Sequence, residues 1–257
     1  MTEYSEVDET DDDGVLRVLI NRPDKRNPLS RSVLRRLRSI FDARRDDQNL
    51  RLAVVTGAGD KCFAAGGDLK ELGTLRLYQD AVDFSDEAYN TLEAIRCFPL
   101  PVVAALNGDA LGGGAELSVA CDIRIMAAHA RIGFIQGRLN ISTSWGGGAD
   151  LMRLVGPARA LSLMTRGVMV GGAAAIAIGL AEAAAQDSDF SGFIECFIAP
   201  MRRQTSLVAR AFKAQAIAAR MSDTRSEARR LERDSFGATW THSDHWNAVA
   251  AISTRPR

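Results

Sequence analysis

Short apolar runs alternate with longer amphipathic stretches along this chain. The runs at 15–21, 52–56, 102–106 and 123–127 predict buried strands, because they are short, rich in aliphatic residues and end at turn-forming residues. The stretches at 30–45 and 78–96 predict helices, and Ser30 is placed to cap the first of them. Since strand, glycine-rich loop and helix recur, we expect an α/β fold that coils as a spiral of β-β-α units.

The strand pattern fades after about residue 156. Helices are expected at 158–167, 171–180, 190–219, 226–236 and 244–252, and the apolar segment 168–185 is expected to form a packed helix pair. The predicted organisation is an acidic flexible tail (1–13), a spiral core (14–190) and a helical C-terminal region (191–257).

Charge and cysteine usage exclude several classes of function. The 32 basic and 32 acidic side chains cancel, which argues against nucleic acid or an anionic membrane as a partner. The acidic start is unlike a signal peptide, and no apolar stretch is long enough to span a bilayer, so a cytoplasmic protein is expected. The four cysteines lie far apart without zinc spacing, which predicts structural thiols and no metal.

Two glycine-rich segments, 63–72 and 112–114, follow apolar strands and lead towards helical sequence. Neither matches a dinucleotide or phosphate-loop motif. Backbone N–H groups of two such loops can converge on one carbonyl oxygen and stabilise negative charge on it. The alternative is that these glycines only permit tight turns and close packing.

Glu116 follows Gly113 by three residues, so a helix would return it to the same face. There it can move a proton at the carbon next to a polarised carbonyl. The alternative is that an acidic residue in a first helical turn serves only the helix dipole.

Five segments together resemble the crotonase (enoyl-CoA hydratase/isomerase) superfamily. They are INRPDKRNPLS (20–30), FAAGGDLKEL (63–72), FSDEAYNTLEAIRCFPLPVV (84–103), VVAALNGDALGGGAELSVACDIRIMAAHARIGF (102–134) and SWGGGADLMRLVGPARAL (144–161). The resemblance implies a CoA thioester substrate, no separate cofactor, and a homo-oligomer that is a trimer or a dimer of trimers. The C-terminal helices would then serve trimerisation or act as a lid, with Phe236 and Trp240 lining the acyl pocket.

The same resemblance assigns roles to individual residues. The oxyanion hole maps to the N–H groups of Gly67 and Gly113. The turn at Lys25 and Arg26 and the 63–70 backbone would hold the CoA moiety, through Arg26, Ala65, Gly67, Asp68, Leu69, Lys70 and Gly113. Arg26 and Lys70 would supply charge to its phosphates, although either can equally be a solvated surface charge.

The family's hydratases use two glutamates, and the first maps to Glu116. The second belongs to a stretch F-G-x-P-E-x-x-x-G. Alignment on the WGGG sequence at 145–148 puts Gln136 at that position and leaves Asp122 and Arg138 out of register. Because an amide cannot exchange a proton as a carboxyl group does, Gln136 brings a two-carboxylate hydration into question.

Hydration of an enoyl-CoA remains the first expectation. The stretch up to SWGGG also resembles the ethylmalonyl-CoA decarboxylase branch, and one glutamate suffices for decarboxylation or for double-bond isomerisation. A non-catalytic relative, for example an RNA-binding protein or a structural subunit, is the remaining alternative; the neutral charge and the intact glycines argue against it.

Overall fold

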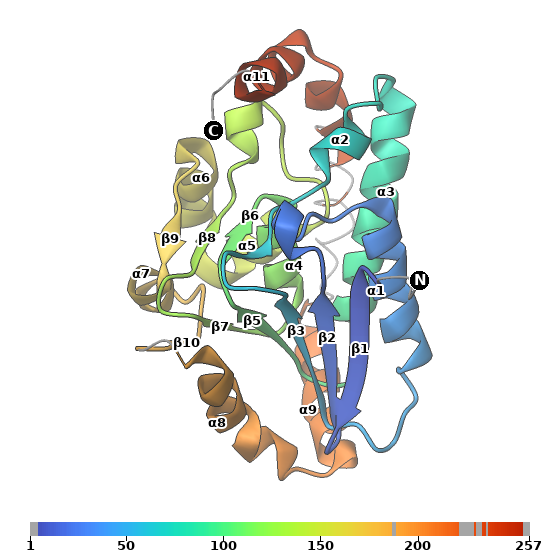
Figure 1. Ribbon diagram of the computed structural model, residues 1–257, viewed down its shortest axis with the longest axis vertical. Helices are drawn as coiled ribbons and strands as arrows, with labels where there is room; N and C mark the ends of the chain where they lie inside the picture. Colours follow the sequence, from blue (N-terminus) through green and yellow to red (C-terminus); the bar gives the residue numbers. More distant parts are fainter. Residues whose placement is uncertain (1–4, 187–188, 221–228, 230–232, 235, 254–257) are drawn as a thin grey trace.

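The computed structural model describes residues 5–186, 189–220, 229, 233–234 and 236–253. Its strands form two sheets (Figure 1). The six-stranded sheet has the order β1 (Val7–Asp12), β2 (Val15–Ile20), β3 (Leu52–Gly57), β5 (Val102–Leu106), β7 (Ile123–Met126), β10 (Ala183–Ala184). The four-stranded sheet has the order β4 (Cys62–Ala64), β6 (Asp109–Leu111), β8 (Arg131–Gly133), β9 (Val170–Gly171).

The two sheets are filled alternately by the chain. β3, β5 and β7 pair in parallel in the first sheet, and the strand that follows each of them, β4, β6 and β8, pairs in parallel in the second. Each pair of strands adds one turn to a coil, so the predicted spiral of β-β-α units is confirmed.

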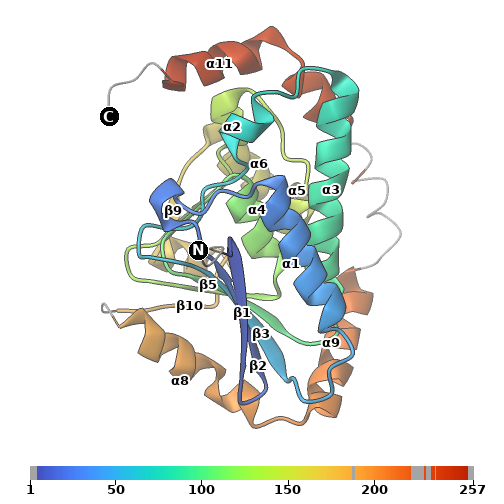
Figure 2. The ribbon, with the colours of Figure 1, turned by 45° about the vertical axis from the view of Figure 1, so that its right-hand side comes forward.

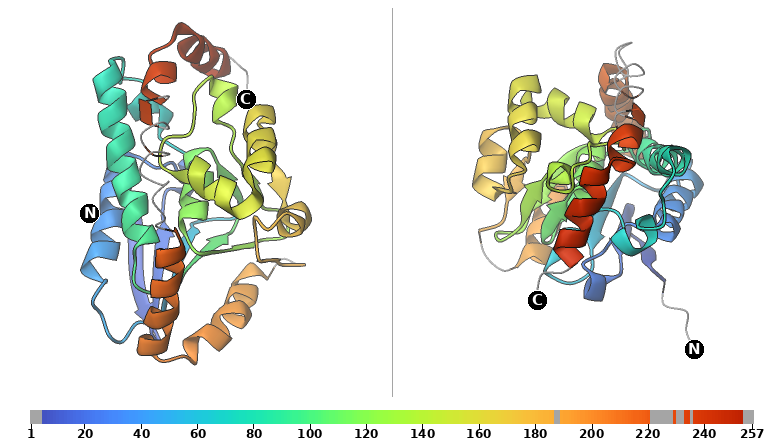
Figure 3. Two further views of the ribbon diagram at one scale, coloured as in Figure 1. Left: turned by 180° about the vertical axis from the view of Figure 1, so that it is seen from behind. Right: turned by 90° about the horizontal axis from the view of Figure 1, so that it is seen from above.

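The described helices are α1 (Arg31–Ala43), α2 (Leu69–Leu72), α3 (Tyr78–Arg96), α4 (Gly113–Ala120), α5 (Gly147–Val155), α6 (Pro157–Arg166), α7 (Gly172–Ala177), α8 (Phe190–Arg202), α9 (Ser206–Arg220) and α11 (Ser243–Ser253), with short 3-10 turns η1 (Pro23–Lys25) and η2 (Gln136–Leu139). α1 and α3 pack side by side along the first sheet (Figure 2). α11 lies at the opposite end of the molecule from α8 and α9 (Figures 1 and 3). None of the helices in the described ranges is long and apolar enough to cross a membrane.

The sequence explains these elements locally. β3 and β5 are buried on both faces, as expected for continuous aliphatic strands in a parallel sheet. α1 begins where the Ser30 hydroxyl accepts a hydrogen bond from the N–H of Val33, so the predicted cap is confirmed. α3 has the predicted bounds.

The acidic N-terminal segment differs from the prediction of a flexible tail. Residues Val7–Asp12 form β1, which pairs antiparallel with β2 in a hairpin that turns at Asp13 and Gly14. Val7 is buried, the carboxylate of Glu9 pairs with Arg36 on α1, and that of Asp11 pairs with Arg44 directly after α1. Pairing with β2 and basic partners on and directly after α1 order a segment that composition alone marks as solvated.

The C-terminal half also differs in detail. The predicted helix over 190–219 is two helices, α8 and α9, separated at residues 203–205. The segment 168–185, predicted as a helix pair, contains the strands β9 and β10 and the short helix α7. These two-residue strands complete the edges of the sheets and are too short to leave an alternating pattern. The helix predicted at 226–236 lies largely outside the described residues.

Candidate functional site

A cavity of about 630 Å³ lies between α4, η2, the loop before α5 and the C-terminal segment. Its walls are mainly apolar. Described residues lining it include Ala65, Gly66, Gly67, Leu69, Leu72, Phe84, Gly112, Gly113, Glu116, Ile135, Gln136, Arg138, Leu139, Ile141, Ser144, Trp145, Phe236 and Trp240.

The two glycine-rich loops meet in this cavity. A Cβ added at Gly66 would lie 3.2 Å from the amide nitrogen of Gly113. Gly66 (φ +87°) and Gly112 (φ +53°) each precede a predicted donor and adopt a conformation that side chains strongly disfavour. Within the described chain, the N–H groups of Gly67 and Gly113 have no hydrogen-bond partner. The sequence-predicted pair is therefore brought together with both donors available.

Trp145 closes the space behind these glycines. A Cβ at Gly113 would lie 2.3 Å from the indole ring, and one at Gly67 would lie 3.8 Å from it. The ring also packs edge-on against Phe84, with centroids 5.8 Å apart. Glycine at position 113 is thus required by the close approach of a rigid aromatic ring.

Glu116 is buried in the first turn of α4, with 2% of its surface exposed, and lines the cavity. Its Oε2 accepts hydrogen bonds from the N–H groups of Trp145 (2.9 Å) and Gly147 (3.0 Å), and its Oε1 accepts one from the Gln136 amide (2.9 Å). These donors stabilise the carboxylate and fix its orientation. Glu116 therefore lines the cavity and also holds the start of α5, rather than only the dipole of its own helix α4; its proposed catalytic role stays a prediction.

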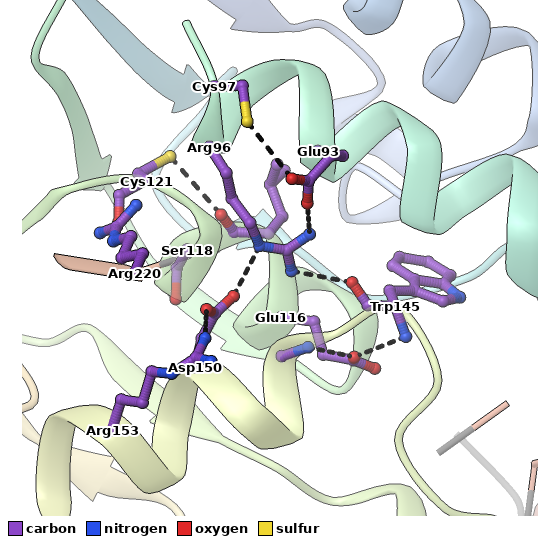
Figure 4. A network of polar contacts seen from close by, with 12 residues as sticks. Glu93, Arg96, Cys97, Glu116, Ser118, Cys121, Trp145, Asp150, Arg153 and Arg220 are labelled. Carbon is purple, nitrogen blue, oxygen red and sulfur yellow. Dashed lines mark hydrogen bonds and ion pairs between the residues drawn. The ribbon is translucent and has the colours of Figure 1, made fainter. Parts of the chain in front are cut away.

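A buried ion pair supports the loop that binds Glu116 (Figure 4). The guanidinium of Arg96 donates to the Asp150 carboxylate at 2.7 Å and to the carbonyl oxygen of Trp145 at 2.8 Å. Burial alone would lower the pKa of Arg96, but the charges of Asp150 and Glu93 hold it above its usual value. Arg96 thus remains a cation and ties α3 to the loop before α5.

Gln136 differs from Glu116 in having an unsatisfied polar atom. Its Nε2 donates to Glu116, while its Oε1 is buried and lacks a partner among the described residues. Gln136 lines the cavity and is 9% exposed, but its Oε1 is itself buried, so this oxygen is an unsatisfied acceptor in the cavity wall.

The structure bears on the register chosen for Gln136. Alignment on WGGG crosses the loop at 140–144, which begins with the left-handed Asn140. Counted without a gap from Phe134, the stretch F-G-x-P-E places Gln136 at the variable position and Arg138 at the glutamate. Arg138, which the sequence reading set aside, lines the cavity.

The predicted CoA-binding residues are distributed unevenly. Ala65, Gly67, Leu69 and Gly113 line the cavity. Arg26 is exposed beside a separate hollow of about 470 Å³, although its carbonyl oxygen accepts from the N–H of Ala65.

Lys70 is exposed on α2. Asp68 caps α2 by accepting from the N–H of Lys70 and pairs with Arg22 at 3.1 Å. Asp68 is therefore engaged within the protein.

The buried cysteines and the buried histidine lie in surroundings that favour packing over catalysis. Burial raises the pKa of the Cys62 and Cys121 thiols to about 12, so neither is a nucleophile at neutral pH. His245 is buried, and its Nδ1 donates to the carbonyl oxygen of Leu139 at 2.8 Å. Phe236 and Trp240 line the cavity as predicted.

Sequence reasoning assigned no role at the site to Trp145, Arg96 or Asp150. The position of Trp145 before a triple glycine was its available signal. The pairing of Arg96 with Asp150, 54 residues apart, leaves no local pattern.

Known proteins of one family resemble this chain in both sequence and fold. The profile of the enoyl-CoA hydratase/isomerase family matches residues 10–253. A crotonyl-CoA hydratase of Syntrophomonas wolfei is 32% identical over 91% of this chain and 89% of its own length. An ethylmalonyl-CoA decarboxylase of Xenopus tropicalis is 31% identical over 93% of this chain and 80% of its own. The crystal structure of an enoyl-CoA hydratase/isomerase from Xanthobacter autotrophicus, 21% identical, shares the fold with a TM-score of 0.89 over 98% of this chain and 94% of that one.

Proposed function

This chain belongs to the enoyl-CoA hydratase/isomerase family, and we propose that it is an acyl-CoA lyase of the hydratase type. The observation that carries the proposal is the pair of unpartnered N–H groups, on Gly67 and Gly113, that line one cavity with the carboxylate of Glu116. CoA is part of the substrate, and no separate cofactor is required.

The two N–H groups would bind the thioester carbonyl oxygen. When water adds at the β-carbon of an enoyl thioester, electron density moves onto this oxygen and an enolate forms. Two fixed donors stabilise that negative charge more than they stabilise the neutral carbonyl, which lowers the barrier. Removing one such donor typically costs ~10²–10³ in rate.

Glu116 is proposed as the group that transfers the proton. Its carboxylate is held by backbone donors of the α5 start, so it keeps a fixed position beside the enolate. Gln136 would orient the Glu116 carboxylate through its amide donor, and its unsatisfied Oε1 could accept from the attacking water once a small side-chain rotation exposes it. In this scheme Glu116 removes a proton from water as the oxygen bonds to the β-carbon, and then gives that proton to the α-carbon of the enolate.

Decarboxylation of an alkylmalonyl-CoA is the second candidate. Glu116 is the sole carboxylate among the described residues lining the cavity, and this reaction needs one proton donor. The bond between the α-carbon and the carboxylate breaks, CO₂ leaves, and the same enolate takes a proton at carbon. The relatives whose names describe ethylmalonyl-CoA decarboxylases favour keeping this candidate. Double-bond isomerisation likewise requires one proton-transfer group.

A homo-oligomer, as a trimer or a dimer of trimers, is part of the proposal. Leu207 and Phe212 on α9 are 78% and 62% exposed, which favours burial of this helix against another subunit.

The test is to incubate the purified protein separately with crotonyl-CoA and ethylmalonyl-CoA and to follow product masses. A gain of 18 Da from crotonyl-CoA supports hydration, and a loss of 44 Da from ethylmalonyl-CoA supports decarboxylation, as the masses of water and CO₂ require. Each reaction should be lost in Glu116→Gln. Turnover that is unchanged in that folded variant would refute the proposed role of Glu116.

A further inference from the structure

One cationic side chain in the cavity wall, Arg138, is exposed and has no carboxylate partner among the described residues. Among its described lining residues, Glu116 and Arg138 carry the charges. Glu116 is compensated by backbone and amide donors, as described above. Arg138 pairs with no carboxylate in the described part of the chain, so its positive charge has no partner of opposite sign.

The side chain of Arg138 is held while most of its donors stay available. One Nη2–H donates to the carbonyl oxygen of Gly167 at the end of α6. Gly167 has φ +55°, and a Cβ there would lie 3.3 Å from Cγ and Nε of Arg138, so the arginine stem packs closely on this turn. A guanidinium has five N–H donors in a planar fork, so several remain for a planar anion.

The position of Arg138 points to the acyl end of the substrate. It lies on η2, two residues after Gln136, whose amide contacts Glu116. The neighbouring wall consists of apolar residues, Ile135, Leu139 and Ile141, with Phe236 and Trp240 from the C-terminal segment. Such a wall fits a hydrocarbon chain, and a single cation within it fits an anionic group borne by that chain.

We propose that Arg138 binds a carboxylate on the acyl group, so that the preferred substrates are CoA thioesters of acids with a second carboxylate. This inference rests on the proposed function, because it assumes that a CoA thioester occupies the cavity. Arg138 then determines specificity and does not take part in proton transfer. A planar carboxylate accepts two N–H groups of the fork and neutralises the cation as the ligand excludes water.

Binding of unreactive thioesters tests this independently of turnover. Glutaryl-CoA carries a terminal carboxylate, 5-methylhexanoyl-CoA carries an isopropyl group of similar shape there, and free CoA carries neither. We expect the parent protein to bind glutaryl-CoA roughly five- to tenfold more tightly than its neutral counterpart, as measured by calorimetry. Arg138→Met should remove this preference and leave the dissociation constants of 5-methylhexanoyl-CoA and free CoA unchanged.

Two further variants serve as controls. Arg159→Met changes another exposed arginine that donates to a backbone carbonyl, outside the cavity, and should keep the preference. Arg138→Lys keeps the positive charge but lacks the planar set of N–H donors, so it should keep part of the preference for glutaryl-CoA.

Three results would overturn the inference: equal binding of the two thioesters by the parent, loss of affinity for free CoA in Arg138→Met, or an equal effect of Arg159→Met. Loss of affinity for free CoA would place Arg138 at a CoA phosphate instead. Failure of every thioester to bind would overturn the proposed function itself. Specific binding of glutaryl-CoA without turnover of any enoyl or malonyl thioester would overturn the proposed chemistry and leave the carboxylate site standing.

Discussion

The substitution Gly113→Ala adds one methyl group where Trp145 approaches the backbone most closely. The new Cβ would lie 2.3 Å from one carbon of the indole and 2.4 Å from another. Ordinary carbon–carbon contact requires about 3.5 Å, so the ring or the loop must move by roughly 1 Å. Unlike proline, alanine keeps the N–H at this position, so the substitution tests placement of the donor and not its presence.

The displacement has limited room. The Trp145 ring packs against Phe84. The backbone N–H of Trp145 donates to Glu116, and its carbonyl oxygen accepts from Arg96. Overpacking of this kind costs about 1–3 kcal/mol of stability, and a shift of about 1 Å at a reacting centre can lower the rate ~10²-fold. We therefore expect a melting temperature lower by several degrees and a larger loss in kcat than in affinity for the thioester.

The control is Gly171→Ala, since Gly171 has open space around the position of a Cβ and ordinary φ. The double variant Gly113→Ala/Trp145→Leu removes the obstructing ring, and a double-mutant cycle should show that the two changes are less costly together than their sum. If Gly113→Ala matched Gly171→Ala in both melting temperature and kcat, the close contact with Trp145 would not control the site.

Three other outcomes follow from the same region. Glu116→Gln should fold, because its amide oxygen can accept from the same two backbone N–H groups and Gln136 can turn its own oxygen towards the new amide. Turnover should nevertheless fall ~10²-fold or more in steady-state kinetics. Loss of the fold with full activity per folded molecule would contradict this role. Asp150→Ala should lower the free energy of unfolding by about 3 kcal/mol or more in urea titrations, because it leaves the buried Arg96 charged and unpaired with Asp150. A change below about 1 kcal/mol would show that Arg96 finds another partner. Burial lowers the pKa of His245, so the folded state favours the neutral imidazole. The contribution of His245 to the free energy of unfolding should be fully present above about pH 6.5 and decline as the pH falls below that value. His245→Gln should flatten this part of the pH profile of stability, and an unchanged profile would exclude His245 as its source.

Much of the fold could be predicted because its signals are local. Continuous aliphatic runs gave β2, β3, β5 and β7, and the serine cap gave the start of α1. β1 was missed because its order depends on pairing with β2 and on basic side chains on and directly after α1, and neither leaves a mark in the segment itself. β9 and β10 were missed because strands of two residues have no measurable periodicity.

The residues of the site likewise divide into those with a local signal in the sequence and those without one. The glycines at 67 and 113 and the glutamate at 116 belong to contiguous motifs, so the sequence indicated them before their convergence was known. Arg138 was left out of register by the alignment on WGGG, and it lines the same cavity as Gln136. The contact between Trp145 and Gly113 depends on the distance between two loops, which no sequence pattern specifies.

The strand β1 has a further consequence for how molecules of this protein meet in solution. β1 is the outermost strand of the six-stranded sheet, so one side of its backbone is left without a neighbouring strand among the described residues. Unprotected edges of this kind recruit strands from other molecules, whereas closely spaced carboxylates repel an incoming chain. The sequence DETDD at 8–12 gives this strand four carboxylates, of which only Glu9 and Asp11 pair with arginines (Arg36 and Arg44) among the described residues, while β2 behind it reads VLRVLI. Deleting the first twelve residues would therefore expose an aliphatic edge, and the shortened protein is expected to aggregate under conditions that keep the full chain dispersed.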